Sequence, residues 1–416
     1  MPAVKKLMIS TIALLLLLSG LAPGMTGIAL APIYDRYADA VLGQPDFIAY
    51  EANNGSAFPS AQSLNKPGGI AIHLLSGRLY VADTFNHRVL SWPNAASFSN
   101  FAAADMVFGQ GGVFNTNTAN NGGVSASSLY HPTGLAVDSN GNLYAADTEN
   151  HRILRFNNPP VDGTTADMVF GQGGVFNTNT TNKGGASADS LNWPGGLAVD
   201  SNGNLYVADK ENNRVLKYNA PLTDTTADLV LGQANFTTAS AAPTSERSLT
   251  LPEAVAVDSA GNLYAADAGN FRVLGYEIPL STHKAATFLF GQANFGDHVD
   301  YCELTPAADN LCNPLGIFVD GAGVLYISDV QFDRVLLFYS PLSSTPPVVA
   351  DEVIGQPNFT SELTPKPPYS YGLDYPNALA VDSVPNLYVS DSSNNRVLRF
   401  DTTHPGEFTY LPLLNK

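Results

Sequence analysis

The chain has 416 residues, of which 37 are acidic and 20 are Lys or Arg, and its formal charge is −17. Such an acidic surface argues against nucleic-acid binding, which needs a basic face that neutralises phosphates and releases counterions. A chain of this length ordinarily forms two or three domains, unless an internal repeat organises it as a single one.

The first 31 residues have the pattern of a secretory signal peptide. Lys5 and Lys6 precede an apolar stretch at 7–18, and Ala29-Leu30-Ala31 offers a small-x-small cleavage site. Pro32 disfavours a cut directly after that site, so a nearby cut or an uncleaved anchor are the alternatives. Since no other segment is long and apolar enough to cross a membrane, we expect a secreted or extracytoplasmic product with no membrane span after signal removal.

A unit of about 25 residues recurs six times after this leader, and each copy begins at a proline. The copies start at Pro67, Pro132, Pro194, Pro252, Pro314 and Pro376. A regular period of this length predicts a repeat architecture, in which each unit buries its faces only by stacking on its neighbours.

Each copy contains three short apolar runs, which in the third copy are 196–199, 205–208 and 214–218. The first two runs are separated by 200–204, an Asp/Ser/Asn/Gly cluster typical of a hairpin turn. A fourth run, ending in Gly-Gln, precedes every copy; these runs are 41–44, 107–110, 169–172, 229–233, 288–292 and 353–356. The runs are rich in Val, Leu, Tyr and Phe and lack helical periodicity, so we expect strands.

Four antiparallel strands repeated six times predict an all-β fold, a six-bladed β-propeller over residues 32–407. A linear array is the alternative, but it would need polar capping repeats, and the end copies resemble the middle ones. The sixth copy has no Gly-Gln run after it, whereas residues 39–44 precede the first copy. We therefore expect 39–44 to pair outside 396–400 and close the ring. The apolar tail at 408–416 could extend this edge or stay loose.

These units resemble the NHL repeat, and the resemblance runs from about residue 38 to 400. The Asp-x-x-Asn-His-Arg motif of that family stands here at Asp83–Arg88 and Asp147–Arg152. The fifth copy departs from it, with Phe332 and Asp333 in the Asn and His positions, which leaves the conformation of its turn open. The resemblance implies a secreted, bacterial-type six-bladed β-propeller.

Two polar residues occur in all six copies, and a catalytic group would be needed only once. They are Asp83, Asp147, Asp209, Asp267, Asp329 and Asp391, with Arg88, Arg152, Arg214, Arg272, Arg334 and Arg396. We interpret them as structural: the Asp accepts N–H groups of the adjoining tight turn and the Arg forms a charge-assisted pair.

The sequence offers two weak candidates for metal sites. The hairpin sequence at 138–142 lacks the wider ligand spacing of a calcium loop, and His87 and His151 lack a third zinc ligand. We expect no metal and no cofactor.

The only two cysteines, Cys302 and Cys312, fall in one long connection. In an exported protein such a pair predicts a local disulfide, beside the divergent fifth copy.

Positions that break the repeat at the start of the innermost strand are the candidates for recognition. They are Lys66, His131, Trp193, Glu253, Asn313, Tyr375 and Asn377, which should ring the mouth of the central channel. Neutral drift would also produce such variety. The connections that lead to these positions are about 18 to 22 residues long, a length usually associated with function. We expect a monomeric extracellular binding module whose partner is a protein, peptide or glycan.

The alternative is a metal-assisted lyase or lactonase-like enzyme using the same mouth, because six-bladed proteins similar to this chain include such enzymes. Their chemistry needs His or carboxylate groups at the channel. The innermost strands here open instead with Gly69, Gly134, Gly196, Ala254, Gly316 and Ala378. Residues without functional atoms weaken the enzyme interpretation, although the long connections could supply the missing groups.

Overall fold

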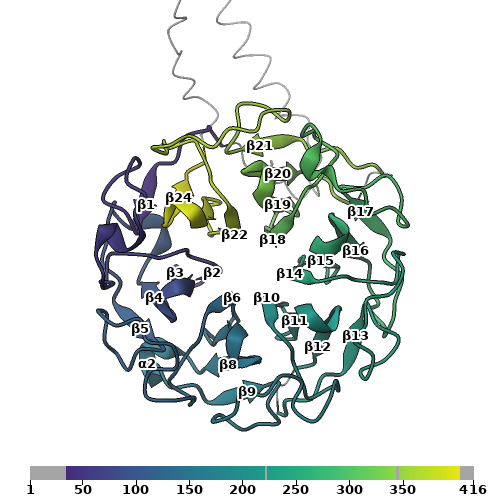
Figure 1. Cartoon of the computed structure of the whole chain (residues 1–416), viewed down its shortest axis with the longest axis horizontal. Coiled ribbons are helices and arrows are strands. Elements are labelled where there is room, and N and C mark those ends of the chain that lie inside the picture. Colours follow the sequence, from purple (N-terminus) through teal and green to yellow (C-terminus); the bar gives the residue numbers. More distant parts are fainter. Residues whose placement is uncertain (1–33, 221–222, 343–345, 403–416) are drawn as a thin grey trace, which may run out of the picture. The chain divides into compact units, whose positions relative to one another are not determined.

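The computed structural model describes residues 34–220, 223–342 and 346–402, which form six four-stranded antiparallel sheets arranged around a central axis (Figure 1). The predicted six-bladed β-propeller is therefore confirmed. The predicted signal peptide at 1–31 and the tail at 408–416 lie outside the described residues. Within the described ranges, no helix has the length and apolarity required to span a bilayer.

The strands are numbered along the chain, and the strands of each blade run in order from the innermost to the outermost. Blade one contains β2 (Ile70–His73), β3 (Arg78–Asp83), β4 (Arg88–Trp92) and β5 (Met106–Phe108); blade two contains β6 (Pro132–Val137), β7 (Leu143–Asp147), β8 (Arg152–Phe156) and β9 (Met168–Phe170). Blade three contains β10 (Pro194–Val199), β11 (Leu205–Asp209), β12 (Arg214–Tyr218) and β13 (Leu229–Leu231); blade four contains β14 (Pro252–Val257), β15 (Leu263–Asp267), β16 (Arg272–Tyr276) and β17 (Phe288–Phe290). Blade five contains β18 (Pro314–Val319), β19 (Leu325–Asp329), β20 (Arg334–Phe338) and β21 (Glu352–Ile354); blade six contains β22 (Pro376–Val381), β23 (Leu387–Asp391), β24 (Arg396–Phe400) and β1 (Ala40–Leu42).

In the part of the chain that the structure describes, the helical segments are single turns. In each blade a 3-10 turn joins the second and third strands: η2 (Thr84–Asn86), η4 (Thr148–Asn150), η5 (Lys210–Asn212), η6 (Ala268–Asn270), η8 (Val330–Phe332) and η9 (Ser392–Asn394). The other turns, η1 (Ala52–Gly55), η3 (Ala95–Ser97), α2 (Pro159–Asp162) and η7 (Tyr301–Glu303), lie in connections.

The N-terminal strand closes the ring as the sequence predicts. β1 pairs antiparallel with β24, with Val41 opposite Leu398 and Leu42 opposite Val397. Tyr34 extends this contact, because it bridges to Thr402 and its hydroxyl donates to the Pro385 carbonyl at 2.8 Å. Both ends of the described chain are thus joined in blade six.

The core lies between blades, since each hydrophobic cluster draws side chains from two neighbouring sheets. Between blades two and three, for example, Ala136 and Tyr144 pack with Leu197, Leu205 and Val207. Alternation along the strands sends successive side chains to opposite faces, so each sheet contributes to two such cores.

The repeated Asp–Arg pair is buried and anchors the long connection that leads into its own blade. In blade one Arg88 Nε lies 2.7 Å from Asp83 Oδ2, and both side chains are fully buried. Asp83 Oδ1 accepts the backbone N–H of Asn65 at 2.7 Å, and Arg88 Nη2 donates to the carbonyls of Ser60 and Ser63. The pair is therefore structural as expected, but the backbone N–H that the Asp accepts belongs to the connection. From the adjoining turn it accepts the side-chain amide of Asn86 at 2.8 Å.

The fifth copy keeps the common turn despite its divergent residues. Asp333 has φ of 49°, close to the values of 51° to 55° in the other copies. Phe332 cannot donate to the carboxylate as Asn does elsewhere, and instead its ring lies 4.9 Å from the Arg334 guanidinium carbon. A cation–π contact thus replaces a hydrogen bond without changing the backbone.

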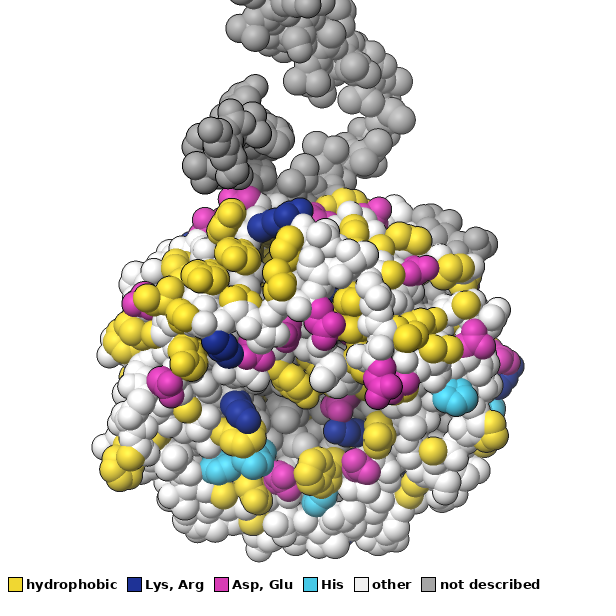
Figure 2. Space-filling model, turned by 45° about the horizontal axis from the view of Figure 1, so that its top comes forward, with side chains coloured by type: hydrophobic (Ala, Val, Ile, Leu, Met, Phe, Trp, Pro, Cys, Tyr) yellow, Lys and Arg dark blue, Asp and Glu magenta, His cyan; other side chains and the backbone are white. Residues whose placement is uncertain are grey.

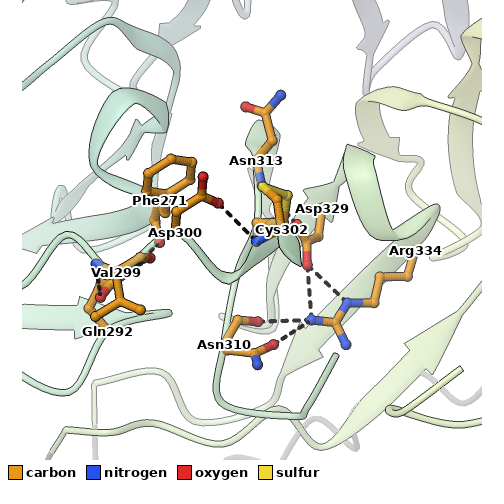
Figure 3. Close-up of a disulfide and its surroundings, with 10 residues drawn as sticks. Phe271, Gln292, Val299, Asp300, Cys302, Asn310, Asn313, Asp329 and Arg334 are labelled. Carbon is orange, nitrogen blue, oxygen red and sulfur yellow. Dashed lines mark hydrogen bonds and ion pairs between the residues drawn. A yellow bond between two sulfur atoms is a disulfide. The ribbon is translucent and has the colours of Figure 1, made fainter. Parts of the chain in front are cut away.

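The predicted disulfide joins Cys302 and Cys312, whose Cα atoms are 4.7 Å apart (Figure 3). The N–H of Cys312 donates to Asp329 Oδ1 at 2.9 Å, so the disulfide is attached directly to the buried Asp329–Arg334 pair.

Candidate functional site

The residues that precede the repeated prolines have a left-handed backbone in five of the six blades. Lys66, His131, Trp193, Leu251 and Tyr375 have φ between 47° and 58°. This conformation costs a residue with a side chain roughly 1–2 kcal/mol. Glycine would remove that cost, yet none of the five positions holds glycine.

The preceding blade holds each of these strained residues through its backbone N–H. Trp193 donates to His151 Nδ1 at 3.2 Å, and Tyr375 donates to Asp333 Oδ1 at 2.8 Å. The same bond joins His131 to His87, Lys66 to Asn395 and Leu251 to Asn213. The side chain in the motif's His position therefore accepts a hydrogen bond that links one blade to the next. This explains why His, Asn and Asp, which all carry acceptors, occur there.

The junction between blades four and five lacks this hydrogen bond. Phe271 occupies the acceptor position and has no side-chain hydrogen-bond acceptor. Asn313 accordingly donates its N–H to Asp329 of its own blade at 3.1 Å and is absent from the left-handed positions. The disulfide lies at this junction, with Phe271 nearby (Figure 3).

One group of side chains at the mouth, the histidine cluster, comes from blades one and two. It consists of Lys66, Phe85, His87, His131 and Glu149. The Lys66 ammonium lies 4.9 Å from the Phe85 ring centre, and the His131 ring lies 4.9 Å from Phe85 and 4.5 Å from His87. His131 Nδ1 is 3.5 Å from the Glu149 carboxylate. The cluster offers a cation, an acid and stacked rings at the channel mouth.

A second group, the ion-pair cluster, consists of Trp193, Lys210, Glu253 and Tyr375. Lys210 Nζ lies 2.6 Å from Glu253 Oε1, and Trp193 and Tyr375 each remain 37% exposed. Burial raises the pKa of Tyr375, with a further contribution from Glu253 that Lys210 opposes. Glu253 and Lys210 belong to blades four and three, so the Tyr375 phenol at the start of blade six lies within electrostatic range of both blades.

Below the two clusters, the six innermost strands enclose a cavity of 660 Å³. Trp193, Lys210, Glu253 and Asn377 line its upper end. Figure 2 shows basic, acidic, histidine and hydrophobic side chains gathered around the hollow on this face.

The predicted site residues are therefore partly brought together. Lys66 and His131 share one cluster, while Trp193, Glu253 and Tyr375 share the other, and Asn377 lines the cavity. Asn313 does not line the cavity. Sequence reasoning missed Phe85, Glu149 and Lys210, which lie on the 3-10 turns η2, η4 and η5. The signal was available, since these turn positions also break the repeat.

The small residues at the start of the innermost strands have a steric cause. A Cβ on Gly69 would lie 2.2 Å from the Thr133 carbonyl oxygen, and one on Gly134 would lie 2.2 Å from that of Gly195. Neighbouring inner strands approach too closely there for a functional side chain. Within residues 34–220, 223–342 and 346–402, no cluster of three His, Cys, Asp or Glu side chains could hold a metal.

Burial shifts the pKa of three of the side chains that accept these backbone N–H groups. Burial, reinforced by the charge of His131, lowers the pKa of His87 to about 4, and burial also lowers that of His151. Burial raises the pKa of Asp333 to about 6. A neutral His87 is the form that can accept the His131 N–H, which matches the direction of its shift.

His87→Asn is expected to remove part of the acid sensitivity of the fold. The pKa of His87 is lower in the folded chain than the ordinary 6.5, so its stabilising contribution is complete above pH 6.5 and is lost as pH falls toward 4. Asparagine accepts the same N–H at residues 213 and 395 without titrating. The variant should match the wild type in thermal unfolding near pH 7.5 and exceed it near pH 5. A constant difference across this range would contradict the prediction; Asp333, which acts in the opposite direction, is common to both proteins.

Comparisons with known proteins agree with this fold. A model of the NHL repeat matches residues 129–156 and 191–218. The chain is 28% identical over 171 residues to the chloroplastic protein SUPPRESSOR OF QUENCHING 1 of Arabidopsis thaliana, covering 41% of this chain and 15% of that protein. It is 29% identical over 172 residues to human NHL repeat-containing protein 2, covering 40% of this chain and 22% of that one. The chain thus spans less than a quarter of the length of either relative.

A solved structure of a Bacteroides thetaiotaomicron protein of unknown function is similar to this fold, with a TM-score of 0.53 and 13% identity. The match covers 87% of this chain and 76% of that one, and at this identity it supports the fold alone.

Proposed function

This chain is an NHL-repeat protein, and we propose that it is an extracellular binding module that captures its partner on the channel-mouth face. The partner would be a protein, peptide or glycan. It would contact the histidine cluster, the ion-pair cluster and the long connections around them. The N-terminal pattern at 1–31 and the Cys302–Cys312 disulfide support an extracytoplasmic setting.

The strained backbone at the mouth is the observation that carries this proposal. Five non-glycine residues are held at positive φ, and three of them, Lys66, Trp193 and Tyr375, leave much of their side chain exposed. An exposed side chain packs against few neighbours, so packing offsets little of the free-energy cost of the left-handed backbone. Strain of this kind clusters at functional sites, where it is retained because the side chain is used. Half-exposed aromatic rings are also frequent anchors in interfaces.

Trp193→Ala combined with Tyr375→Ala is expected to weaken partner binding by at least tenfold, because truncating an aromatic hot spot costs about 2 kcal/mol or more. The fold should persist, since neither ring is a core side chain. Affinity would be measured by capturing the partner from the native culture on wild-type protein and titrating the identified partner against each variant. Ile278→Ala, an exposed apolar residue on the connection after β16, serves as the matched control.

Trp193→Asn separates recognition from folding more sharply. Asparagine tolerates the left-handed backbone, so this variant should unfold at or above the wild-type temperature while losing binding. Undiminished binding by Trp193→Asn and by the double variant would move the site away from the mouth.

The alternative function, a lyase or lactonase-like enzyme, differs from the binding module in its need for a metal ion. It requires a stoichiometric divalent metal at the channel, so elemental analysis of the purified protein discriminates between the two functions. A metal bound at one equivalent and removed by mutation of mouth residues would favour the enzyme.

A further inference from the structure

The central cavity has an aliphatic wall along most of its length. Each innermost strand places two apolar residues, two positions apart, on the same side, as Leu197 and Val199 do in blade three. Val199 and its counterparts Ile72, Val137 and Val257 remain partly exposed. In the described lining, these side chains face a channel without any charged group between its two ends.

Phe318 makes this wall uneven. The other five blades have Ala at the equivalent strand position (Ala71, Ala136, Ala198, Ala256 and Ala380), whereas blade five has Phe318. Phe318 lines the cavity and stays partly exposed, with its ring 6.5 Å from that of Tyr326. This aromatic surface within the aliphatic wall, in addition to Trp193 at the mouth, gives the cavity an asymmetric shape.

Charges in the described lining lie only at the ends. At the mouth, Lys210 and Glu253 neutralise each other at 2.6 Å. At the base, His73, Asp138 and Asp200 line the cavity, and His73 Nδ1 lies 2.7 Å from the Ser76 hydroxyl. The carboxylate of Asp138 already accepts from two backbone N–H groups, the Asn142 amide and the Tyr144 hydroxyl. An anionic ligand would meet a lysine already paired with Glu253 at one end, and two aspartates beside His73 at the other. The paired Lys210 and Glu253 can still donate to and accept from a neutral polar group.

We propose that the channel is a binding site for an uncharged, elongated aliphatic molecule, such as a long-chain alcohol, ester or amide, with its polar end at Lys210 and Glu253. The cavity volume of 660 Å³ lies within the range of about 300–1,000 Å³ typical of small-molecule sites. An inner strand of six residues is roughly 20 Å long, which suits an extended chain. This site shares Lys210 and Glu253 with the mouth, but its aliphatic wall lies on the innermost strands below the surface proposed for the partner. A channel that binds no ligand would therefore leave the proposed partner site at the mouth untouched.

The test uses the neutral dye N-phenyl-1-naphthylamine, whose fluorescence rises in an apolar environment, with the mature ring at about pH 8. The wild type is expected to bind the dye at one equivalent. 1-Decanol should displace it at a concentration at least tenfold lower than decanoate. The carboxylate would lose its hydration at a mouth where Lys210 is already paired with Glu253, and Asp138 and Asp200 would repel it at the base. Equal displacement by the two competitors would overturn the preference for an uncharged ligand.

Substitutions in the channel wall test whether the dye binds inside the channel. Val199→Phe and Val257→Phe narrow the channel and should each weaken dye binding at least tenfold, whereas Val299→Phe, on an exposed connection, should not. Val257→Thr keeps the side-chain shape and should weaken binding about threefold to tenfold even if the larger residues disturb folding. Tyr375→Ala should leave dye binding unchanged, which separates this site from the mouth. Absence of dye binding by the wild type, or wild-type affinity in Val257→Thr and both Phe variants, would overturn the proposal.

Discussion

Deleting residues 32–44 is expected to lower the free energy of unfolding by at least about 5 kcal/mol. The deletion removes the buried side chains of Tyr34, Val41 and Leu42, each contributing roughly 1.5–3 kcal/mol. It also exposes the hydrogen-bonding edge of β24 and frees the segment whose Phe47 carbonyl accepts from Arg396 Nη1. Urea unfolding of chains that begin at residue 32 and at residue 45, followed by circular dichroism, measures the loss.

Two single substitutions, one at a buried and one at an exposed position, provide reference values for the loss of stability caused by the deletion. Leu42→Ala should cost about 2–5 kcal/mol, because Leu42 is fully buried between blades six and one. Ile48→Ala should change stability by less than about 0.5 kcal/mol, because Ile48 is 55% exposed. An unchanged unfolding midpoint after the deletion would show that β1 does not close the ring.

Arg214→Met is expected to destabilise the chain by about 3–5 kcal/mol. The side chain is fully buried, lies 2.7 Å from Asp209 and donates to the carbonyls of Ser187 and Ser190. Removing the guanidinium leaves a buried carboxylate without its counterion and carbonyls without donors. The measurement is equilibrium unfolding of the variant beside the wild type at constant pH.

Arg155→Met provides the matched control, because Arg155 forms an ion pair with Asp167 that is partly exposed to solvent. Such pairs contribute about 0–1 kcal/mol. In a double-mutant cycle, Asp209→Asn with Arg214→Met should recover part of the loss, since it removes the unpaired charge. Similar effects of Arg214→Met and Arg155→Met would show that burial of the pair is energetically unimportant.

The fold could be predicted because every blade repeats the same local signals. Pro194, the hairpin cluster at 200–204 and the Gly-Gln run at 171–172 mark strand boundaries without any tertiary information. The ring closure was also predictable, since only the sixth copy lacks a following outer strand. These are properties of adjacent residues or of the order of the copies.

The site was less predictable because its contacts cross between copies. The role of His151 depends on the backbone of Trp193 in the next blade, 42 residues later. The electrostatic coupling between Tyr375 and Glu253 links residues of blades six and four, which are more than 100 residues apart in the chain. The residue spacing within one copy predicts neither the His151–Trp193 hydrogen bond nor the Tyr375–Glu253 coupling. From the sequence, His151 is only a consensus residue of the repeat, and Glu253 is one of several positions that depart from it.

The shared left-handed geometry of the mouth also makes this ring a scaffold for combinatorial variation. Lys66, His131, Trp193, Leu251 and Tyr375 extend from the same backbone turn, held by the same main-chain hydrogen bond to a neighbouring blade. Because that bond uses the backbone, it is indifferent to the side chain it presents. A library randomised at these five codons would therefore sample new recognition surfaces on an unchanged framework, in the way that antibody loops vary on a constant sandwich.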